Sequence, residues 1–234
     1  MSKQIVPVNS NLHQTVRVLR DPTFNQAKDA QLVPVVVQEV MDCAIEYPVV
    51  LVKNAHSGQF VLVAMMGLKS GENLYCGEVK FDGHYVPQVL RHYPFVLQAT
   101  PNSEHMLLSI DEHSPLVNQQ EGEHLFDSAG EQSPFLVNKA KALQLHHEQQ
   151  QITESFVALL LQYQLLSQQQ LTIQLGAGQP TILDGVYLVD QKRLDELSEA
   201  EYLALRKNGA LAIIHAHLLS LKQLNRLARR ALTL

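Results

Sequence analysis

The sequence predicts an α+β fold with a β-rich N-terminal portion, mostly antiparallel hairpins, and a long helix followed by a smaller C-terminal helix–sheet portion. Three patterns carry this prediction. Short apolar runs separated by turn residues fill most of the first 138 residues. One helical pattern covers residues 139–167, and strand-like and helix-like segments alternate after it. We therefore expect two portions, residues 1–138 with an N-terminal helix and residues 139–234, packed as one compact unit.

The first helix is expected over residues 32–48, in "LVPVVVQEVMDCAIEYP". Pro34 suits the first turn of a helix, where its missing N–H costs nothing. Val37 and Val40 begin a series of apolar residues at helical spacing. Pro48 disfavours helical geometry at the residue before it and ends the helix.

The next two strands are expected in "VVLVKNAHSGQFVLVAMMGL", residues 49–68. Two β-rich apolar runs flank a turn that contains Asn54, Ser57 and Gly58, which is the pattern of a hairpin with buried strands. Further on, "MLLSIDE" and "EHLFDSAGEQSPF" predict strands and turns, with Asp127 and Gly130 supplying turn chemistry.

Acidic residues dominate the segment from His92 to Asn138, which contains no lysine or arginine. The carboxylates lack the spacing of a calcium-binding loop. The segment is therefore expected to form a solvated acidic face.

One long helix is expected over residues 139–167. Glutamines dominate one face of this helix, and the opposite, apolar face is formed by Ile152, Phe156, Leu159, Tyr163 and Leu166. The adjacent His146 and His147 point about 100° apart on a helix and do not readily share a metal.

The C-terminal portion begins with a hairpin whose turn contains Gly176 and Gly178. A compact helix follows over residues 197–209, with Ser198 as its N-cap and Gly209 as its stop. Residues 210–219, "ALAIIHAHLL", predict a buried strand.

A last amphipathic helix is expected to begin at Ser220. Its inward residues are Leu221, Leu224, Leu227 and Ala231. Its exposed residues are Lys222, Arg226, Arg229 and Arg230, with no acidic residue among them. The glutamine face of the long helix and this basic face are the two surfaces through which the chain could form a homo-oligomer.

Composition excludes several classes of protein. The net charge of −5, the absence of tryptophan and the low aromatic content of 6% argue against a nucleic-acid binder. The longest apolar run, residues 60–68, is shorter than the roughly 20 residues of a membrane-spanning helix. No secretory signal opens the sequence, and two distant cysteines suit a reducing compartment, so we expect a soluble cytoplasmic protein.

His215 and His217 form the sharpest candidate for a metal site. On a strand, alternate residues share a face with Cα atoms about 7 Å apart, and two such imidazoles could hold one metal. A third ligand is needed and none is adjacent in sequence. The favoured alternative is a pair of hydrogen-bonded histidines beneath the last helix, so no cofactor is predicted.

The segment "YVPQVLRHYPF", residues 85–95, is the main candidate for a ligand site. Pro87 can open a short helix and Pro94 ends it, which places Arg91 near a helix C-terminus. There Arg91 either caps unsatisfied carbonyls or offers its guanidinium to a carboxylate or phosphate, with Tyr85 and His92 at the rim. The capping interpretation is favoured.

Signatures of nucleophilic, metal-protease and phosphate-loop chemistry are missing from the sequence. The favoured hypothesis is a non-catalytic binding protein for a partner protein, peptide or small ligand. The alternative is an enzyme whose site is assembled from scattered residues, with a metal-dependent version that uses His215 and His217. The scattered residues are Glu39, Arg91, His92, Asp111, His215 and His217.

Six segments in order resemble the SapC family, named from a bacterial surface-layer-associated gene. They are "AIEYPVVLVKN", "GLKSGENLYC", "YVPQVLRHYPF", "EGEHLFDSAGE", "LDGVYLVDQKRLDEL" and "LRKNGALAIIHAHLLSL". The resemblance spans nearly the whole chain. It leads us to expect a second arginine where this chain has His92, which argues against a role that needs two adjacent cations.

The resemblance implies no reaction, cofactor or catalytic residue. Similar proteins are encoded near tryptophan-halogenase-like proteins, cupin-type oxygenase-like proteins and TonB-dependent receptors. This context implies an accessory role, with a protein or peptide partner, in an uptake or modification pathway. A structural role in a surface layer ranks last because no export signal is visible.

Overall fold

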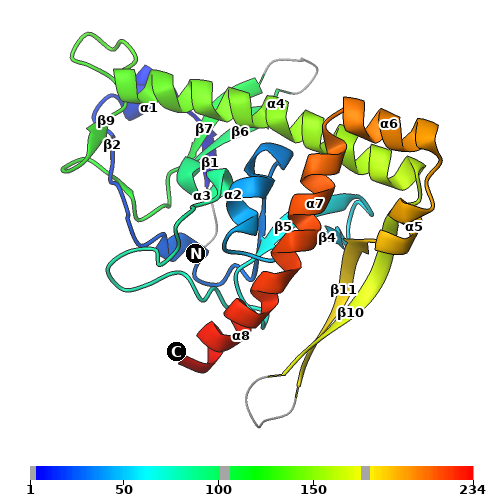
Figure 1. Cartoon of the computed structure of the whole chain (residues 1–234). Coiled ribbons are helices and arrows are strands. Elements are labelled where there is room, and N and C mark those ends of the chain that lie inside the picture. Colours follow the sequence, from blue (N-terminus) through cyan, green and yellow to red (C-terminus); the bar gives the residue numbers. More distant parts are fainter. Residues whose placement is uncertain (1–3, 101–105, 175–179, 234) are drawn as a thin grey trace. The chain divides into compact units, whose positions relative to one another are not determined.

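The computed structural model describes residues 4–100, 106–174 and 180–233 and confirms a mixed α+β fold (Figure 1). The chain forms two compact units that are each discontinuous in sequence. Unit 1 comprises Met1–Pro22 and Gln88–Glu148, and unit 2 comprises Thr23–Pro87 and Gln149–Leu234. The boundary predicted after residue 138 falls inside a helix, α4 (Pro134–Gln162).

Unit 1 contains two small antiparallel sheets, in the strand orders β1-β7-β6 and β8-β2-β9. Its strands are β1 (Ile5–Pro7), β2 (Arg17–Val18), β6 (Phe95–Ala99), β7 (Met106–Asp111), β8 (Val117–Asn118) and β9 (Glu123–His124). Its helices are α1 (Ser10–His13), α3 (Gln88–His92) and the first half of α4. Apolar side chains from these strands and from α4 form one core that includes Phe95, Ile110, Leu125 and Leu136.

Unit 2 is built on a five-stranded antiparallel sheet in the order β10-β11-β4-β5-β3. Its strands are β3 (Leu32–Pro34), β4 (Val49–Lys53), β5 (Phe60–Met65), β10 (Leu166–Ile173) and β11 (Thr181–Val189). Its helical segments, besides the second half of α4, are η1 (Asn25–Ala27), η2 (Val37–Glu39), α2 (Val40–Ala44), α5 (Gln191–Asp195), α6 (Glu199–Lys207), α7 (Ala210–Ser220), η3 (Leu221–Gln223) and α8 (Leu224–Thr233).

The hairpin predicted over residues 49–68 is confirmed as β4 and β5. Asn54 organises its turn, since the Oδ1 atom of Asn54 accepts hydrogen bonds from the N–H groups of His56 and Ser57. Gly58 has φ +70°, a conformation that glycine adopts at little cost. The second hairpin is also confirmed as β10 and β11, while its predicted turn at 176–178 lies outside the described residues.

The helix predicted over residues 32–48 is wrong in its first half. Residues Leu32–Pro34 form β3, which pairs with β5, and helical structure begins only at Val37. Proline is tolerated there because β3 is an edge strand, where its missing N–H interrupts no hydrogen-bond ladder. The valine-rich sequence that suggested a helical stripe is equally suited to a buried strand.

The strand predicted over residues 210–219 is wrong, because this segment forms the helix α7. A continuous apolar run does not distinguish a buried strand from a buried helix. Alanine and leucine are strong helix formers, and Gly209, with φ +72°, begins the new helix directly after α6. The inward face of α7 carries Leu211, Ile214 and His217.

The long helix is confirmed, with corrected bounds and a different buried face. It runs from Pro134 to Gln162, and its buried residues in unit 2 include Phe156, Val157 and Leu160. Ile152, predicted to point inward, is exposed. The apolar face predicted from residue spacing is therefore rotated about the helix axis, by about one residue, relative to the face that is buried.

Candidate functional site

The candidate site of unit 2 is a loop of residues 66–87, which joins β5 to α3 and contains no helix or strand. Loops longer than about 12–15 residues without secondary structure are uncommon and are usually either functional or disordered. The contacts of this loop favour the first explanation. Here the loop has an inward side and an exposed tip. The contrast between them determines what the loop can do.

The inward side of the loop is a small core of its own. Tyr75 is completely buried, and its ring packs edge-on against Tyr47 at a centroid distance of 4.8 Å. The Asn73 side chain donates a hydrogen bond to the Ala27 carbonyl at 3.1 Å. Its Oδ1 atom accepts one from the N–H group of Tyr75 at 3.0 Å. These contacts fix the first half of the loop.

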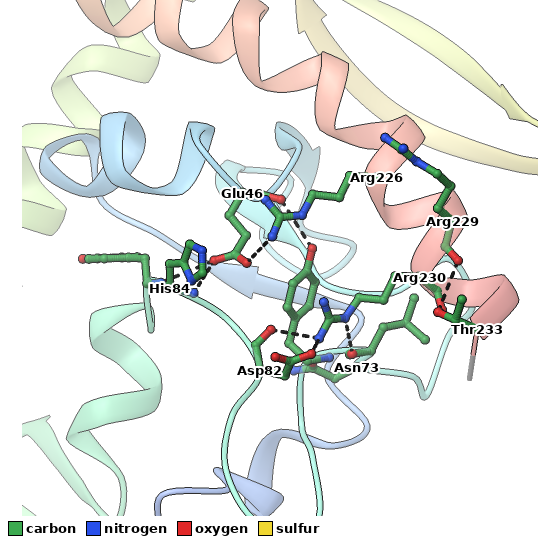
Figure 2. Close-up of polar contacts among 11 residues, drawn as sticks. Glu46, Asn73, Asp82, His84, Arg226, Arg229, Arg230 and Thr233 are labelled. Carbon is green, nitrogen blue, oxygen red and sulfur yellow. Dashed lines mark hydrogen bonds and ion pairs between the residues drawn. The ribbon is translucent and has the colours of Figure 1, made fainter.

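Glu46 fixes the second half of the loop (Figure 2). This residue follows α2 and is only 1% exposed. One carboxylate oxygen accepts a hydrogen bond from the guanidinium of Arg226, on α8, at 3.0 Å. The other accepts hydrogen bonds from the N–H groups of His84 at 2.5 Å and Tyr85 at 3.4 Å. A buried carboxylate is tolerated when it is paired and hydrogen-bonded, and Glu46 meets both conditions.

Arg230 of α8 holds the loop at a second point (Figure 2). It forms an ion pair with the Asp82 carboxylate and donates to the backbone carbonyls of Leu74 at 2.7 Å and Asp82 at 2.8 Å. Its guanidinium also lies 4.2 Å from the centroid of the Tyr75 ring, a cation–π arrangement. Arg230 thus joins both halves of the loop to the C-terminal helix.

Two tyrosines complete these contacts. The Tyr47 hydroxyl donates to the Tyr85 carbonyl, and the Tyr85 hydroxyl donates to Oε1 of Glu39 at 2.7 Å. Burial raises the pKa of Tyr47 well above its usual range. Burial also raises the pKa of Tyr75 to about 12, although nearby Arg230 opposes the shift. Both phenols are therefore neutral at physiological pH.

We call the contacts of Glu46, Tyr47, Asp82, Arg226 and Arg230 the polar clamp. Gly83 lies against it, because a Cβ atom at this position would collide with the Tyr47 hydroxyl and approach the Phe81 ring to 2.6 Å. Only glycine allows this close approach.

The tip of the loop is exposed. Cys76 and Phe81 form an isolated antiparallel bridge, and Glu78, Val79 and Lys80 between them are all exposed. Val79 is 81% exposed, more than any other large hydrophobic residue in the described part of the chain. A rigid base and a solvated apolar tip therefore coexist within a few residues.

The structure brings together two of the residues singled out in the sequence, Tyr85 and Glu39, at the polar base of the loop. Glu39 is buried, and its second oxygen accepts a hydrogen bond from the Val36 N–H at 3.1 Å. This geometry makes Glu39 an anchor for Tyr85 and for the start of η2.

Arg91 and His92 lie at the end of α3 in unit 1, as the two prolines predicted. Arg91 is exposed, and its carbonyl accepts a hydrogen bond from Nζ of Lys139 at 2.8 Å. His92 is buried against His146, with ring centroids 5.0 Å apart. Burial, followed by the neighbouring His146, lowers the pKa of His92 to about 4. Whether Arg91 binds a ligand stays a prediction.

Asp111, also in unit 1, is buried at the end of β7. Its Oδ1 atom accepts hydrogen bonds from the N–H groups of Gln4 at 3.0 Å and His113 at 3.2 Å. These contacts join the N-terminal segment to the turn after β7, which is a structural task.

The strand geometry that suggested a shared metal for His215 and His217 is absent, because both residues lie on α7. Residues two apart on a helix point about 160° apart, toward nearly opposite faces. His217 is buried, with Nδ1 2.8 Å from the Val49 carbonyl and Nε2 3.1 Å from the Val189 N–H, whereas His215 is exposed. Across the described ranges, no cluster of three or more histidine, cysteine, aspartate or glutamate side chains could hold a metal ion.

The polar clamp was not predicted from the sequence. Arg226 and Arg230 were expected on an exposed basic face, yet both are partly buried and ion-paired. Their spacing of four residues, next to the buried Leu227, was the available signal for a shared inward-leaning face. Their acidic partners are 180 and 148 residues away in the chain, so the pairing itself had no local signature.

Comparison with known proteins gives one match. A family model described as SapC matches residues 8–227, nearly the whole chain. No curated protein and no solved structure matches. Within the described residues, no helix combines the length and apolar character needed to span a bilayer.

Proposed function

The chain belongs to the SapC family, and we propose that it is a binding protein whose 66–87 loop presents an apolar tip to a protein or peptide partner. The observation that carries the proposal is the rigid loop with Val79 exposed at its end. The accessory role implied by the family resemblance is compatible with it. Action in the cytoplasm and a partner from the halogenase-like or TonB-receptor-linked systems are parts of the same proposal.

The polar clamp supports a positional role for its charged residues. Removing a carboxylate from water costs several kcal/mol, and a buried ion pair often adds no net stability over apolar residues of similar volume. Glu46 and Arg226 are therefore poorly explained by stability alone. The Glu46 carboxylate accepts hydrogen bonds from the N–H groups of His84 and Tyr85 and so fixes the course of the loop. A nonpolar contact would not impose this directional constraint.

A fixed loop is useful for binding because its conformational entropy is already lost before the partner arrives. Ordering a flexible side chain or loop at an interface costs roughly 0.5–1.5 kcal/mol for each immobilised side chain. A single exposed apolar residue is ordinary on a protein surface. Val79 differs because it stands on a clamped loop between Glu78 and Lys80, which offer both signs of charge around an apolar anchor.

The test compares two matched surface variants in a cross-linking pull-down. Val79→Asp alters the loop tip, and Leu203→Asp places the same charge on the exposed face of α6, elsewhere in unit 2. Bait proteins are incubated with an extract of the source organism and with purified halogenase-like and TonB-linked proteins. We expect one partner to be retained by the wild type and by Leu203→Asp and lost with Val79→Asp.

A partner retained equally by both variants would refute the loop as the binding surface. The absence of any partner across several growth conditions would refute the binding role. Circular dichroism of each bait shows that it is folded, so that loss of a partner reports on the surface alone.

A further inference from the structure

The two edges of the unit 2 sheet differ in how they are protected. One edge is β3, which is only three residues long and ends in Pro34. Short edge strands and prolines are common devices against unwanted strand pairing. The opposite edge is β10, which is eight residues long. In residues 4–100, 106–174 and 180–233, β10 pairs with β11 alone, so its outer side carries no strand.

The sequence of β10 lacks the usual protection. Its residues, "LSQQQLTI", include no charge and no proline. Gln168, Gln169, Gln170 and Thr172 are exposed. In an antiparallel pair, alternate residues direct their N–H and C=O groups to each side of the strand, so half of the β10 backbone groups face outward. Such an edge is a template for a further strand.

The hairpin that contains β10 also extends beyond the sheet (Figure 1). β11 pairs with β4 only at Val186 and Tyr187, so the distal residues of β10 and β11 form a two-stranded ribbon. Two-stranded ribbons are at best marginally stable in water. Additional strands on the β10 side would make this ribbon part of a wider sheet.

We propose that a second copy of this chain pairs with β10, in antiparallel orientation about a two-fold axis, to form one continuous ten-stranded sheet across a homodimer. A two-fold axis places each edge opposite itself, so the edge must be self-complementary. β10 satisfies this requirement because it is neutral in a chain of net charge −5. Gln168, Gln169 and Gln170 make hydrogen bonds within the hairpin. Each glutamine amide has two N–H donors and an oxygen with two lone pairs, so the same side chains retain groups that can pair across the axis.

This interface is distinct from the clamped loop and from the two self-association surfaces considered in the sequence. It does not involve the glutamine face of α4 or the basic face of α8. Substitutions on β10 and on α4 should therefore have different effects on dimer formation, and a matched pair of variants separates these two surfaces.

The experiment measures the mass of the wild-type chain by light scattering and its dissociation constant by analytical ultracentrifugation. We expect a mass twice that of one chain. Gln169→Lys combined with Thr172→Lys places one cation on each face of β10, because residues separated by an odd number of positions lie on opposite faces of a strand. Like charges opposed across the axis should raise the dissociation constant about tenfold or more.

The matched control is Gln150→Lys combined with Gln162→Lys, which adds the same charge to exposed positions of α4. This control should dimerise as the wild type does. Hydrogen exchange of the wild type supplies a second readout that needs no variant. Amides of residues 166–173 should become more protected as the protein concentration rises.

A monomeric wild type at concentrations up to about 200 μM would overturn the proposal. A dimer lost in the α4 control and kept in the β10 variant would assign the interface to α4 instead. Assembly beyond a dimer, or concentration-independent exchange in β10, would also contradict it.

Discussion

Replacing His217 with leucine should destabilise the protein at neutral pH and remove part of its sensitivity to acid. His217 is 2% exposed on the inner face of α7. Nδ1 lies 2.8 Å from the Val49 carbonyl and Nε2 lies 3.1 Å from the Val189 N–H. These partners require the neutral tautomer with the proton on Nδ1, since Nε2 must accept a hydrogen bond.

The pH dependence follows from the lowered pKa of His217, which burial brings to about 4 although the hydrogen bond to Val49 opposes the shift. Between the unfolded value of about 6.5 and the folded value, the unfolded chain binds one proton more than the native chain. Stability therefore rises with pH in this window, by about 1.4 kcal/mol for each unit, and falls as pH is lowered. The full effect is about 3 kcal/mol, present above pH 6.5.

His217→Leu leaves the Val189 N–H, and part of the hydrogen bonding of the Val49 carbonyl, without its partner. A buried group left in this state costs about 1–3 kcal/mol, so we expect a loss of about 2–4 kcal/mol at pH 7.5. At pH 5 the wild type has itself lost about 2 kcal/mol through this histidine. The difference in the free energy of unfolding between the wild type and His217→Leu should therefore be about 2 kcal/mol smaller at pH 5 than at pH 7.5.

Urea denaturation followed by circular dichroism from pH 5 to 7.5 measures this difference in the free energy of unfolding. His92 also has a lowered pKa and is present in both proteins, so its contribution cancels in the comparison. His215→Leu on the exposed face of α7 is the control and should change stability by no more than about 0.5 kcal/mol at any pH. A gap for His217→Leu that is independent of pH would refute the reasoning, as would an NMR titration of His217 near its ordinary pKa.

Three further experiments test the loop and one helix. In a double-mutant cycle of Glu46→Leu and Arg226→Leu, each single change should cost about 2–4 kcal/mol and the double change less than their sum, as measured by urea denaturation; additive costs would show that the pair is not coupled. Gly83→Ala should destabilise by about 1–3 kcal/mol and lower the melting temperature, because its Cβ would meet Tyr47 and Phe81; an unchanged melting temperature would mean that the loop relaxes freely. Ser198→Ala should cost about 1 kcal/mol through the lost N-cap of α6, whereas Ser198→Asp should retain most of the stability.

Most of the fold was predictable because its signals are local. The turn of the β4–β5 hairpin is specified by Asn54 and Gly58, and the start of α6 by the capping box of Ser198 and Glu201. The short helix α3 lies between the two prolines that predicted it. Each of these signals involves residues within a few positions of one another, so no knowledge of distant contacts was needed.

The errors occurred where local patterns fit two structures. Residues 210–219 are apolar throughout, and such a run suits a strand or a helix until its neighbours are known. Here α7 packs on β4, as the Ser220 hydroxyl shows by accepting a hydrogen bond from the Val49 N–H at 2.9 Å. The covering helix is thus selected by a sheet whose central strand lies 171 residues earlier.

The ion pairs of the polar clamp could not be predicted from local sequence, because their partners are distant in the chain. From sequence alone, an arginine on an amphipathic helix is predicted to be exposed to solvent. The desolvation free energy of burying it is offset only by an acidic or carbonyl partner, whose position the local sequence does not reveal. Glu46 offsets that cost for Arg226, and Asp82 with two carbonyls does so for Arg230. The directional ion pairs and hydrogen bonds of Arg226 and Arg230 therefore fix the position of the loop more specifically than apolar packing does. Variants that preserve the Glu46 ion pair and change Val79 separate binding from folding, whereas variants in the clamp change both.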